Sequence, residues 1–253
     1  MQRDSIKAFL CDIGGVLYVG DDVIDGAIQA IQRMKERYPV RFLTNTTQNT
    51  GAQVVEKLQN MGFELEKDEV ITALDITKMF LQEKKSDAFY LLTDDARTFF
   101  EDLSIYPKNY VVVGDAQNNF TYQNLNAAFR LLLDKKELLA VAKNRYFMDA
   151  DNQLSLDAGG FVQMLEFAAD LSAQIIGKPS PSFYHLACAS MKIAPQNTLM
   201  IGDDIQTDIL GAKNAGLQTA LVKTGKFCEK DLKIGVMPNM ILDSIADIEK
   251  IFS

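Results

Sequence analysis

Four polar clusters in this sequence have the residue types needed for chemistry on a charged substrate. They are a lone aspartate, a threonine–asparagine pair, a lysine and an aspartate pair: Asp12, Thr44 with Asn45, Lys178, and Asp203 with Asp204. Carboxylate oxygens bind hard divalent cations such as Mg²⁺. A cation and a lysine can neutralise charge on a transferring phosphoryl group, and a carboxylate oxygen that binds no metal can attack it. The residue types therefore suit metal-assisted phosphoryl transfer, provided that the fold brings them together.

Taken singly, these residues have commoner structural explanations. An aspartate after a strand is usually a loop residue or a helix cap, and Gly177, Lys178 and Pro179 alone would usually form a turn. Asp204 fits a further carboxylate of a metal site and a helix cap equally well. The chemical interpretation depends on all four clusters occurring in order, three of them directly after apolar runs.

The elements that must position these clusters are those of a parallel α/β sheet. Short apolar runs predict strands at residues 7–11, 40–43, 70–72, 198–201 and 219–222, and helical spacing predicts helices at 27–38, 52–61 and 209–215. Strands that alternate with helices predict βαβ units, and hence a Rossmann-like, doubly wound parallel sheet with helices on both faces. Ligands bind at the carboxyl ends of strands in such a sheet, which is where Asp12, Thr44 and Asp203 fall.

The middle of the chain has an α/β pattern of its own. Strands are predicted at residues 89–92, 110–114 and 138–142, with helical segments at 94–103 and 122–133 between them. We therefore expect a smaller α/β domain inserted into the first. The predicted boundaries are 83–172 for the inserted domain, and 1–82 with 173–253 for the core domain.

Composition narrows the functional classes. The chain has 253 residues, a net charge of -8 and a sequence pI near 4.8. Such an acidic protein has no general attraction for nucleic acid or anionic membranes, so we expect neither as a partner. Three cysteines without a C-x-x-C pair indicate free thiols in a reducing compartment. No apolar stretch reaches the length of a membrane span and no signal peptide is evident, so a cytoplasmic protein is expected.

The ordered clusters resemble the four motifs of the haloacid dehalogenase (HAD) superfamily. Residues 12–18 (DIGGVLY), 42–45 (FLTN), 177–180 (GKPS) and 202–204 (GDD) with Asp208 resemble its first to fourth motifs. The resemblance spans nearly the whole chain, and the long gap between the second and third motifs implies an inserted α/β cap of the C2 type. Within the superfamily, the sequence most resembles the branch that contains phospholysine phosphohistidine inorganic pyrophosphate phosphatase and haloacid dehalogenase-like hydrolase domain-containing protein 2.

This resemblance implies a nucleophile and a magnesium site. Asp12 would attack phosphorus and form an aspartyl-phosphate. Mg²⁺ would be held by Asp12, the backbone carbonyl of Gly14 and Asp203, and Asp208 would steady bound water. The cofactor expected from the resemblance is therefore Mg²⁺.

The resemblance also implies substrate contacts. Thr44 would hydrogen-bond phosphoryl oxygens, Lys178 would pair with the phosphate and with Asp12, and Asn45 is expected to bind substrate. The cap of such relatives lies over the site and selects the substrate, a small phosphorylated compound, and capped relatives often form homodimers through the cap. The candidate substrate contacts in the cap are Lys143, Asn144 and Arg145, although a solvated turn would explain these residues as well.

One departure from the superfamily pattern concerns acid–base catalysis. Most phosphatases of the superfamily carry a second aspartate two residues after the nucleophile, and here that residue is Gly14. Acid–base catalysis contributes about 10² to 10⁴-fold in rate. Either the leaving group needs little protonation, as in pyrophosphate or an N-phosphate, or another group such as Thr46, Thr47, a cap residue or water replaces the acid, or the protein binds a phospho-ligand with weak or no turnover. Relatives that cleave phosphonates also lack this aspartate, whereas the intact fourth motif with Asp203 argues against dehalogenation.

Overall fold

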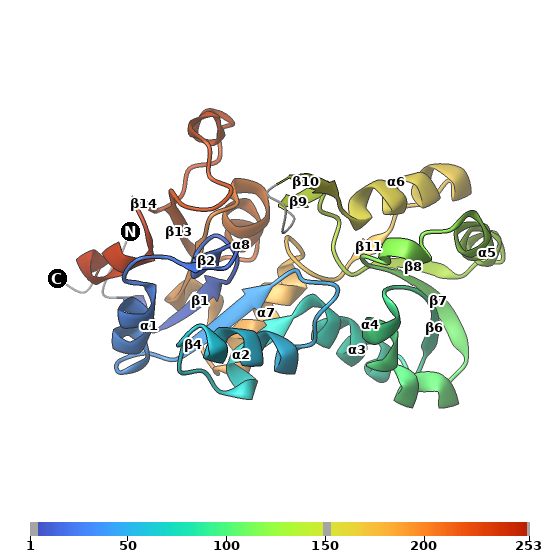
Figure 1. Ribbon diagram of the computed structural model, residues 1–253, viewed down its shortest axis with the longest axis horizontal. Coiled ribbons are helices and arrows are strands. Elements are labelled where there is room, and N and C mark those ends of the chain that lie inside the picture. Colours follow the sequence, from blue (N-terminus) through green and yellow to red (C-terminus); the bar gives the residue numbers. More distant parts are fainter. Residues whose placement is uncertain (1–4, 149–152, 252–253) are drawn as a thin grey trace. The chain divides into compact units, whose positions relative to one another are not determined.

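The computed structural model describes residues 5–148 and 153–251, and the chain folds into two compact units (Figure 1). Unit 1 comprises Met1–Thr44, Ala52–Ile71 and Lys178–Ser253, and unit 2 comprises Asn45–Gly51 and Thr72–Gly177. Each unit is an α/β assembly around its own parallel sheet.

Unit 1 is built on a six-stranded sheet. The order is β14 (Met240–Leu242), β13 (Gln218–Val222), β12 (Thr198–Gly202), β1 (Ala8–Asp12), β4 (Val40–Thr44) and β5 (Val70–Thr72). Every pair from β14 to β4 is parallel, and the central strand β1 is buried along its whole length. A short antiparallel hairpin, β2 (Tyr18–Val19) with β3 (Asp22–Val23), follows β1. The predicted Rossmann-like α/β class is confirmed.

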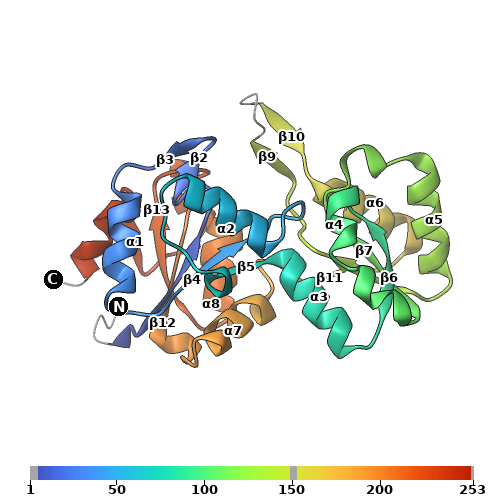
Figure 2. The ribbon, with the colours of Figure 1, turned by 60° about the horizontal axis from the view of Figure 1, so that its bottom comes forward.

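Helices cover both faces of this sheet (Figure 2). They are α1 (Ala27–Lys35), α2 (Gly51–Asn60), α7 (Pro181–Ser190), a π-helical turn at Ile205–Leu210 and α8 (Gly211–Asn214). Alternate residues of a strand point to opposite faces. Phe9 and Cys11 of β1 accordingly pack in one cluster with Ile31 and Met34 of α1 and Leu58 of α2. Burial of these apolar side chains fixes the strand ends that carry the polar clusters.

Unit 2 has a four-stranded parallel sheet in the order β11 (Gln174–Ile175), β8 (Glu137–Ala140), β7 (Lys108–Val113) and β6 (Asp87–Leu91). Its helices are α3 (Ala73–Glu83), α4 (Asp94–Thr98), α5 (Tyr122–Leu133) and α6 (Ala158–Ala169), and β9 (Tyr146–Met148) pairs with β10 (Leu154–Leu156) in an antiparallel ribbon. The side chains of Thr93, Thr121 and Asp157 accept hydrogen bonds from the first backbone N–H groups of α4, α5 and α6.

Helix α3 packs within unit 2, whereas the sequence analysis placed most of it in the core domain. Lys78 donates a hydrogen bond to the carbonyl of Phe99 and pairs with Asp102 at 2.7 Å. The ring of Phe80 lies edge-on to Tyr110, with 5.6 Å between the ring centroids. These partners follow α3 in the sequence, and no local sequence pattern predicts that α3 contacts them.

Short 3₁₀ turns complete the structure at Lys67–Glu69, Glu101–Ile105, Gln117–Asn119, Pro195–Asn197, Glu229–Lys233 and Ile245–Ile251. Among the described residues, no helix combines the length and apolar character required to cross a lipid bilayer.

Candidate active site

Strand pairing brings the first and fourth polar clusters to one edge of the unit 1 sheet. Strand β1 lies between β12 and β4, with Cys11 opposite Ile201 and Asp12 opposite Leu43. Asp12 therefore lies beside the end of β4, whose last residue is Thr44. It also lies beside the end of β12, which Asp203 follows. This is the strand-end arrangement that the sequence predicts.

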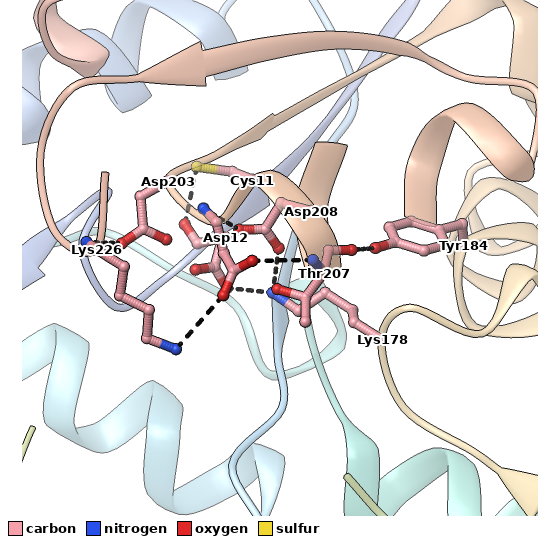
Figure 3. A network of polar contacts seen from close by, with 9 residues as sticks. Cys11, Asp12, Lys178, Tyr184, Asp203, Thr207, Asp208 and Lys226 are labelled. Atoms are coloured by element: carbon pink, nitrogen blue, oxygen red, sulfur yellow. Dashed lines mark hydrogen bonds and ion pairs between the residues drawn. The ribbon is translucent and has the colours of Figure 1, made fainter. Parts of the chain in front are cut away.

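A buried lysine links two of the carboxylates (Figure 3). The Nζ atom of Lys178 donates to Oδ1 of Asp12 at 2.5 Å and to Oδ1 of Asp208 at 2.7 Å. The three side chains are 4%, 12% and 1% exposed, in the order Lys178, Asp12 and Asp208. Burial alone would lower the pKa of Lys178, but the charges of Asp12 and Asp208 hold that pKa well above its usual value. Lys178 is therefore charged at neutral pH and in contact with Asp12.

The carboxylate of Asp203 lies in a tight cradle of backbone. A Cβ atom built on Gly15 or on Gly225 would fall 2.0 Å from Oδ2 of Asp203, so only glycine fits at either position. The backbone N–H of Lys226 donates to the same oxygen at 2.6 Å. Thr224 joins the two glycine loops, because its Oγ1 donates to the carbonyl of Gly15 at 2.5 Å. Packing thus fixes Asp203 before any ligand binds.

Asp12, Asp203 and Asp208 form a group that fits a divalent cation. Each offers a carboxylate oxygen, these oxygens lie within 4.8 Å of one another, and all three residues are buried. Within residues 5–148 and 153–251, no hydrogen bond reaches Oδ1 of Asp203, so this oxygen can serve as a ligand. Hard oxygen donors of this kind are those that Mg²⁺ prefers.

Burial also makes the carboxylates costly to ionise without a counter-charge. Burial, and then the charge of Asp12, raises the pKa of Asp208 to about 7. Burial, followed by the charges of Asp12 and Asp208, raises the pKa of Asp203 well above its usual value. A bound cation would reverse both shifts.

A π-helical turn positions Asp208. The turn spans Ile205–Leu210 and begins at Asp204, whose Oδ1 accepts the backbone N–H groups of Gln206 and Thr207 at 2.9 and 3.0 Å. The buried hydroxyl of Tyr184 donates to the carbonyl of Thr207. Oδ2 of Asp208 accepts the backbone N–H of Asp204 at 3.1 Å. Of the two roles considered for Asp204, these contacts give it that of the helix cap.

Gly14 leaves space for a side chain two residues after Asp12. A Cβ atom built on Gly14 has no neighbour within 4 Å, and its φ does not lie in the left-handed region, unlike that of Gly15 at +83°. An L-amino acid side chain therefore fits at this position.

The remaining predicted residues are distributed between the two units. Thr44 ends β4 in unit 1 and is half-buried, whereas Asn45 belongs to unit 2, where a Cβ atom on Gly177 would lie 2.7 Å from its Oδ1. Lys143, Asn144 and Arg145 also belong to unit 2. The contacts described below for these three lie within that unit.

Lys143 has a structural partner. Its Nζ atom lies 2.6 Å from Oε2 of Glu166 on α6, and the other Glu166 oxygen accepts the N–H of Ala173 at 2.9 Å. The carbonyl of Asn144 accepts the N–H of Gly159 at 2.9 Å, and Arg145 is exposed. The segment is therefore fastened to α6 by its lysine and its backbone, and Arg145 is the cation it presents to solvent.

One part of the site was not predicted from the sequence. Residues 224–226 (TGK) follow β13, and the structure places them against Gly15 and Asp203. The signal was present, because the strand at 219–222 was predicted and its carboxyl end lies at the same sheet edge as Asp12. The segment carries no carboxylate, so its residue types alone do not single it out.

A doubly wound sheet with buried carboxylates and a buried lysine at its strand ends defines an α/β enzyme suited to a cation and an anionic substrate. Residues 9–105 match the family model described as haloacid dehalogenase-like hydrolase, and residues 175–248 match the HAD-hydrolase-like model. The chain belongs to the haloacid dehalogenase-like hydrolases, as its similarity to relatives along nearly its whole length also shows.

Two curated relatives and one solved structure illustrate this similarity. Haloacid dehalogenase-like hydrolase domain-containing protein 2 of Bos taurus is 38% identical over 244 residues, which are 96% of this chain and 94% of that protein. Phospholysine phosphohistidine inorganic pyrophosphate phosphatase of Xenopus laevis is 37% identical over 238 residues, covering 91% and 88%. The structure of 4-nitrophenylphosphatase from Thermotoga maritima superimposes with a TM-score of 0.90 at 25% identity and 98% coverage of both chains. The predicted branch and the enzyme class, a hydrolase of the phosphatase type, are confirmed.

Proposed function

We propose that this protein is a Mg²⁺-dependent phosphohydrolase that acts through an aspartyl-phosphate on Asp12. Its substrate would be a small phosphorylated compound whose leaving group needs little protonation, such as pyrophosphate or an N-phosphate. The observation that carries the proposal is the buried contact of Lys178 with Asp12 beside two further carboxylates. The named phosphatase activities of the relatives support the same reaction class.

The proposed roles follow from the positions of the side chains. Lys178 holds Oδ1 of Asp12 at 2.5 Å, which orients the carboxylate and leaves Oδ2 to attack phosphorus. Thr44, at the next strand end, would donate to a phosphoryl oxygen. Asp208 receives the second hydrogen bond of Lys178 and so keeps the ammonium in place.

Mg²⁺ would be held by Asp12, Asp203 and the carbonyl of Gly14, with Asp208 behind them. When bound, it would neutralise charge on the phosphoryl group and the carboxylates. The chain itself supplies the nucleophile, the lysine and the backbone cradle of Asp203. Gly14 supplies no acid, and for this reason we restrict the proposed substrates to those with good leaving groups.

The proposed nucleophile is tested by comparing two aspartate variants. Asp12→Asn preserves shape but removes the attacking oxygen, and it should lower Mg²⁺-dependent phosphate release from pyrophosphate, phosphoramidate and 4-nitrophenyl phosphate on the order of 10³-fold or more. Asp21→Asn, at an exposed position, should behave like the wild type. Activity of Asp12→Asn near that of Asp21→Asn would refute the assigned mechanism.

Gly14 specifically favours a second candidate, a phospho-ligand-binding protein without turnover. It would bind phosphate or vanadate in the presence of Mg²⁺ and release product no faster than the uncatalysed reaction. Multiple turnovers by the wild type on any of the three substrates exclude this candidate. If the wild type is inert and Gly14→Asp turns over, the binding function is the better conclusion.

A further inference from the structure

The loop that follows β13 holds a lysine at the edge of the carboxylate group, and the site has assigned it no role. We propose that Lys226 determines substrate specificity by binding the departing phosphate of a phosphoanhydride. This inference rests on the proposed function and names the substrate class of the same site.

The backbone of this loop is fixed at three consecutive residues. Thr224 bonds to the carbonyl of Gly15, Gly225 packs against Asp203, and the N–H of Lys226 donates to Asp203 Oδ2. The Cα of Lys226 is therefore anchored beside the metal-binding group, whereas its side chain is 51% exposed. A substrate-binding lysine needs a fixed backbone and an ammonium group that the substrate can reach, and Lys226 has both.

The ammonium of Lys226 extends toward the site and is only loosely paired (Figure 3). Its nearest carboxylate oxygen, Oδ2 of Asp204, lies 3.9 Å away, beyond hydrogen-bond length. Lys178, in contrast, is bound to Asp12 and Asp208 and is buried. A second anionic group can therefore recruit Lys226 at little cost, while Lys178 remains with the nucleophile.

The missing acid at Gly14 indicates what that second group is. Attack by Asp12 Oδ2 forms an O–P bond and breaks the bridging P–O bond, whose electron pair stays on the departing oxygen. Without a proton donor, that oxygen must leave as an anion, and a phosphate leaving group does so. Lys226 would neutralise it. Water then attacks the phosphorus of the aspartyl-phosphate, Asp12 regains its carboxylate, and one water proton ends on each of the two phosphate products.

The test compares two substrates that need no acid but differ in leaving-group charge. These are pyrophosphate and 4-nitrophenyl phosphate, assayed with Mg²⁺. Lys226→Met should lower kcat/KM for pyrophosphate about tenfold or more, since a charge-assisted hydrogen bond is lost. The same variant should stay within about threefold of the wild type on 4-nitrophenyl phosphate, and Lys226→Arg should restore most of the pyrophosphate activity.

The chain offers a matched control in the same loop. Lys223 is 41% exposed and pairs with Asp243 at 2.9 Å, so Lys223→Met removes an equal charge without touching the site. It should leave both activities unchanged. Lys226→Met keeps the backbone N–H that holds Asp203, so the fold and the metal group are retained. Equal losses on both substrates, or no loss on pyrophosphate, overturn the assignment.

A binding measurement separates this inference from the proposed function. Methylenediphosphonate has two phosphoryl groups joined by carbon, and methylphosphonate has one. With Mg²⁺, the wild type should bind the diphosphonate about tenfold more tightly than the monophosphonate, and Lys226→Met should lose this preference. If turnover fails but the preference depends on Lys226, the proposed function falls and the specificity assignment stands. A preference that persists in Lys226→Met refutes the assignment.

Discussion

In the proposed mechanism, the position two residues beyond Asp12 controls which leaving groups the site can expel. Gly14 has no side chain, yet a Cβ there would meet nothing within 4 Å. The site therefore lacks an acid because of one residue and not because of its shape. Substrate range should change accordingly when that residue is changed.

Gly14→Asp should create activity toward alkyl phosphates, whose leaving groups need a proton. General acid catalysis contributes about 10² to 10⁴-fold, and since the new carboxylate is not optimally oriented we expect a gain on the order of 10 to 10²-fold in kcat/KM. The activity on 4-nitrophenyl phosphate should change much less. Gly14→Asn is the matched control, because it has the same shape without an ionisable proton. Equal gains in the two variants would show that the effect is not acid catalysis.

Lys143, which the sequence predicts to bind substrate, forms an ion pair with the buried Glu166 of the same unit. Glu166 is 9% exposed and bonded to both Lys143 and the N–H of Ala173. Removing the lysine leaves a buried carboxylate unpaired, which is costly.

We therefore expect Lys143→Met to lower the free energy of unfolding of the protein by about 1–3 kcal/mol, as measured in urea. The double variant with Glu166→Gln should recover part of that loss, because the unpaired charge is gone. A substrate role makes the opposite prediction: unchanged stability with a raised KM. Arg145→Met, at an exposed neighbouring position, is the comparison for the loss of a solvent-facing charge.

At the scale of elements, residues 224–226 and the turn after β1 pack together around Asp203. Gly225 and Gly20 both have a φ of +61°, but only Gly225 has a carboxylate in the space a Cβ would occupy. Alanine substitutions at Gly20 and Gly225 therefore distinguish two costs in folding free energy. Both include the cost of the left-handed backbone, and only the second includes steric overlap with Asp203.

Gly20→Ala should cost about 1 kcal/mol of folding free energy, the usual penalty for a left-handed residue with a Cβ. Gly225→Ala should cost more than that and should also weaken Mg²⁺ activation, because Asp203 must move. Urea unfolding measures the first effect and the Mg²⁺ concentration for half-maximal activity measures the second. Identical behaviour of the two variants would show that the cradle does not position Asp203.

Local patterns explain which elements could be predicted from the sequence. Strand β1 is a short continuous apolar run and helix α5 has apolar residues at helical spacing, and the strand-end rule then placed Asp12 and Asp203 at one edge. The π-helical turn before α8 has no sequence period that distinguishes it from an ordinary helix. The partners of α3 and the pairing of Lys143 with Glu166 depend on tertiary contacts between distant segments.

At the scale of the whole molecule, the protein is acidic and also buries several carboxylates close together. The chain carries a net charge of -8, and three of its carboxylates are buried within 4.8 Å of one another. Lys178 forms ion pairs with two of them, Asp12 and Asp208. Such a group makes the stability of the folded protein depend on pH and on a bound cation together.

The sign of that dependence follows from the raised pKa values. The pKa of Asp208 is raised to about 7 and that of Asp203 is raised well above its usual value, so the folded, metal-free protein holds protons that the unfolded chain releases. These two groups therefore make stability fall as pH rises from about 4 to about 7. The pKa of Lys178 is raised above 10.5, so this group titrates outside that interval.

Mg²⁺ should reverse this loss, because it binds the ionised carboxylates and must displace protons from them at low pH. We expect Mg²⁺ to raise the midpoint of thermal unfolding clearly at pH 8 and much less at pH 5.5. In Asp203→Asn the Mg²⁺ effect at pH 8 should largely disappear, since a ligand is lost. A shift of equal size at both pH values would mean that the cation binds elsewhere, because binding to the buried carboxylates requires the release of protons in this interval.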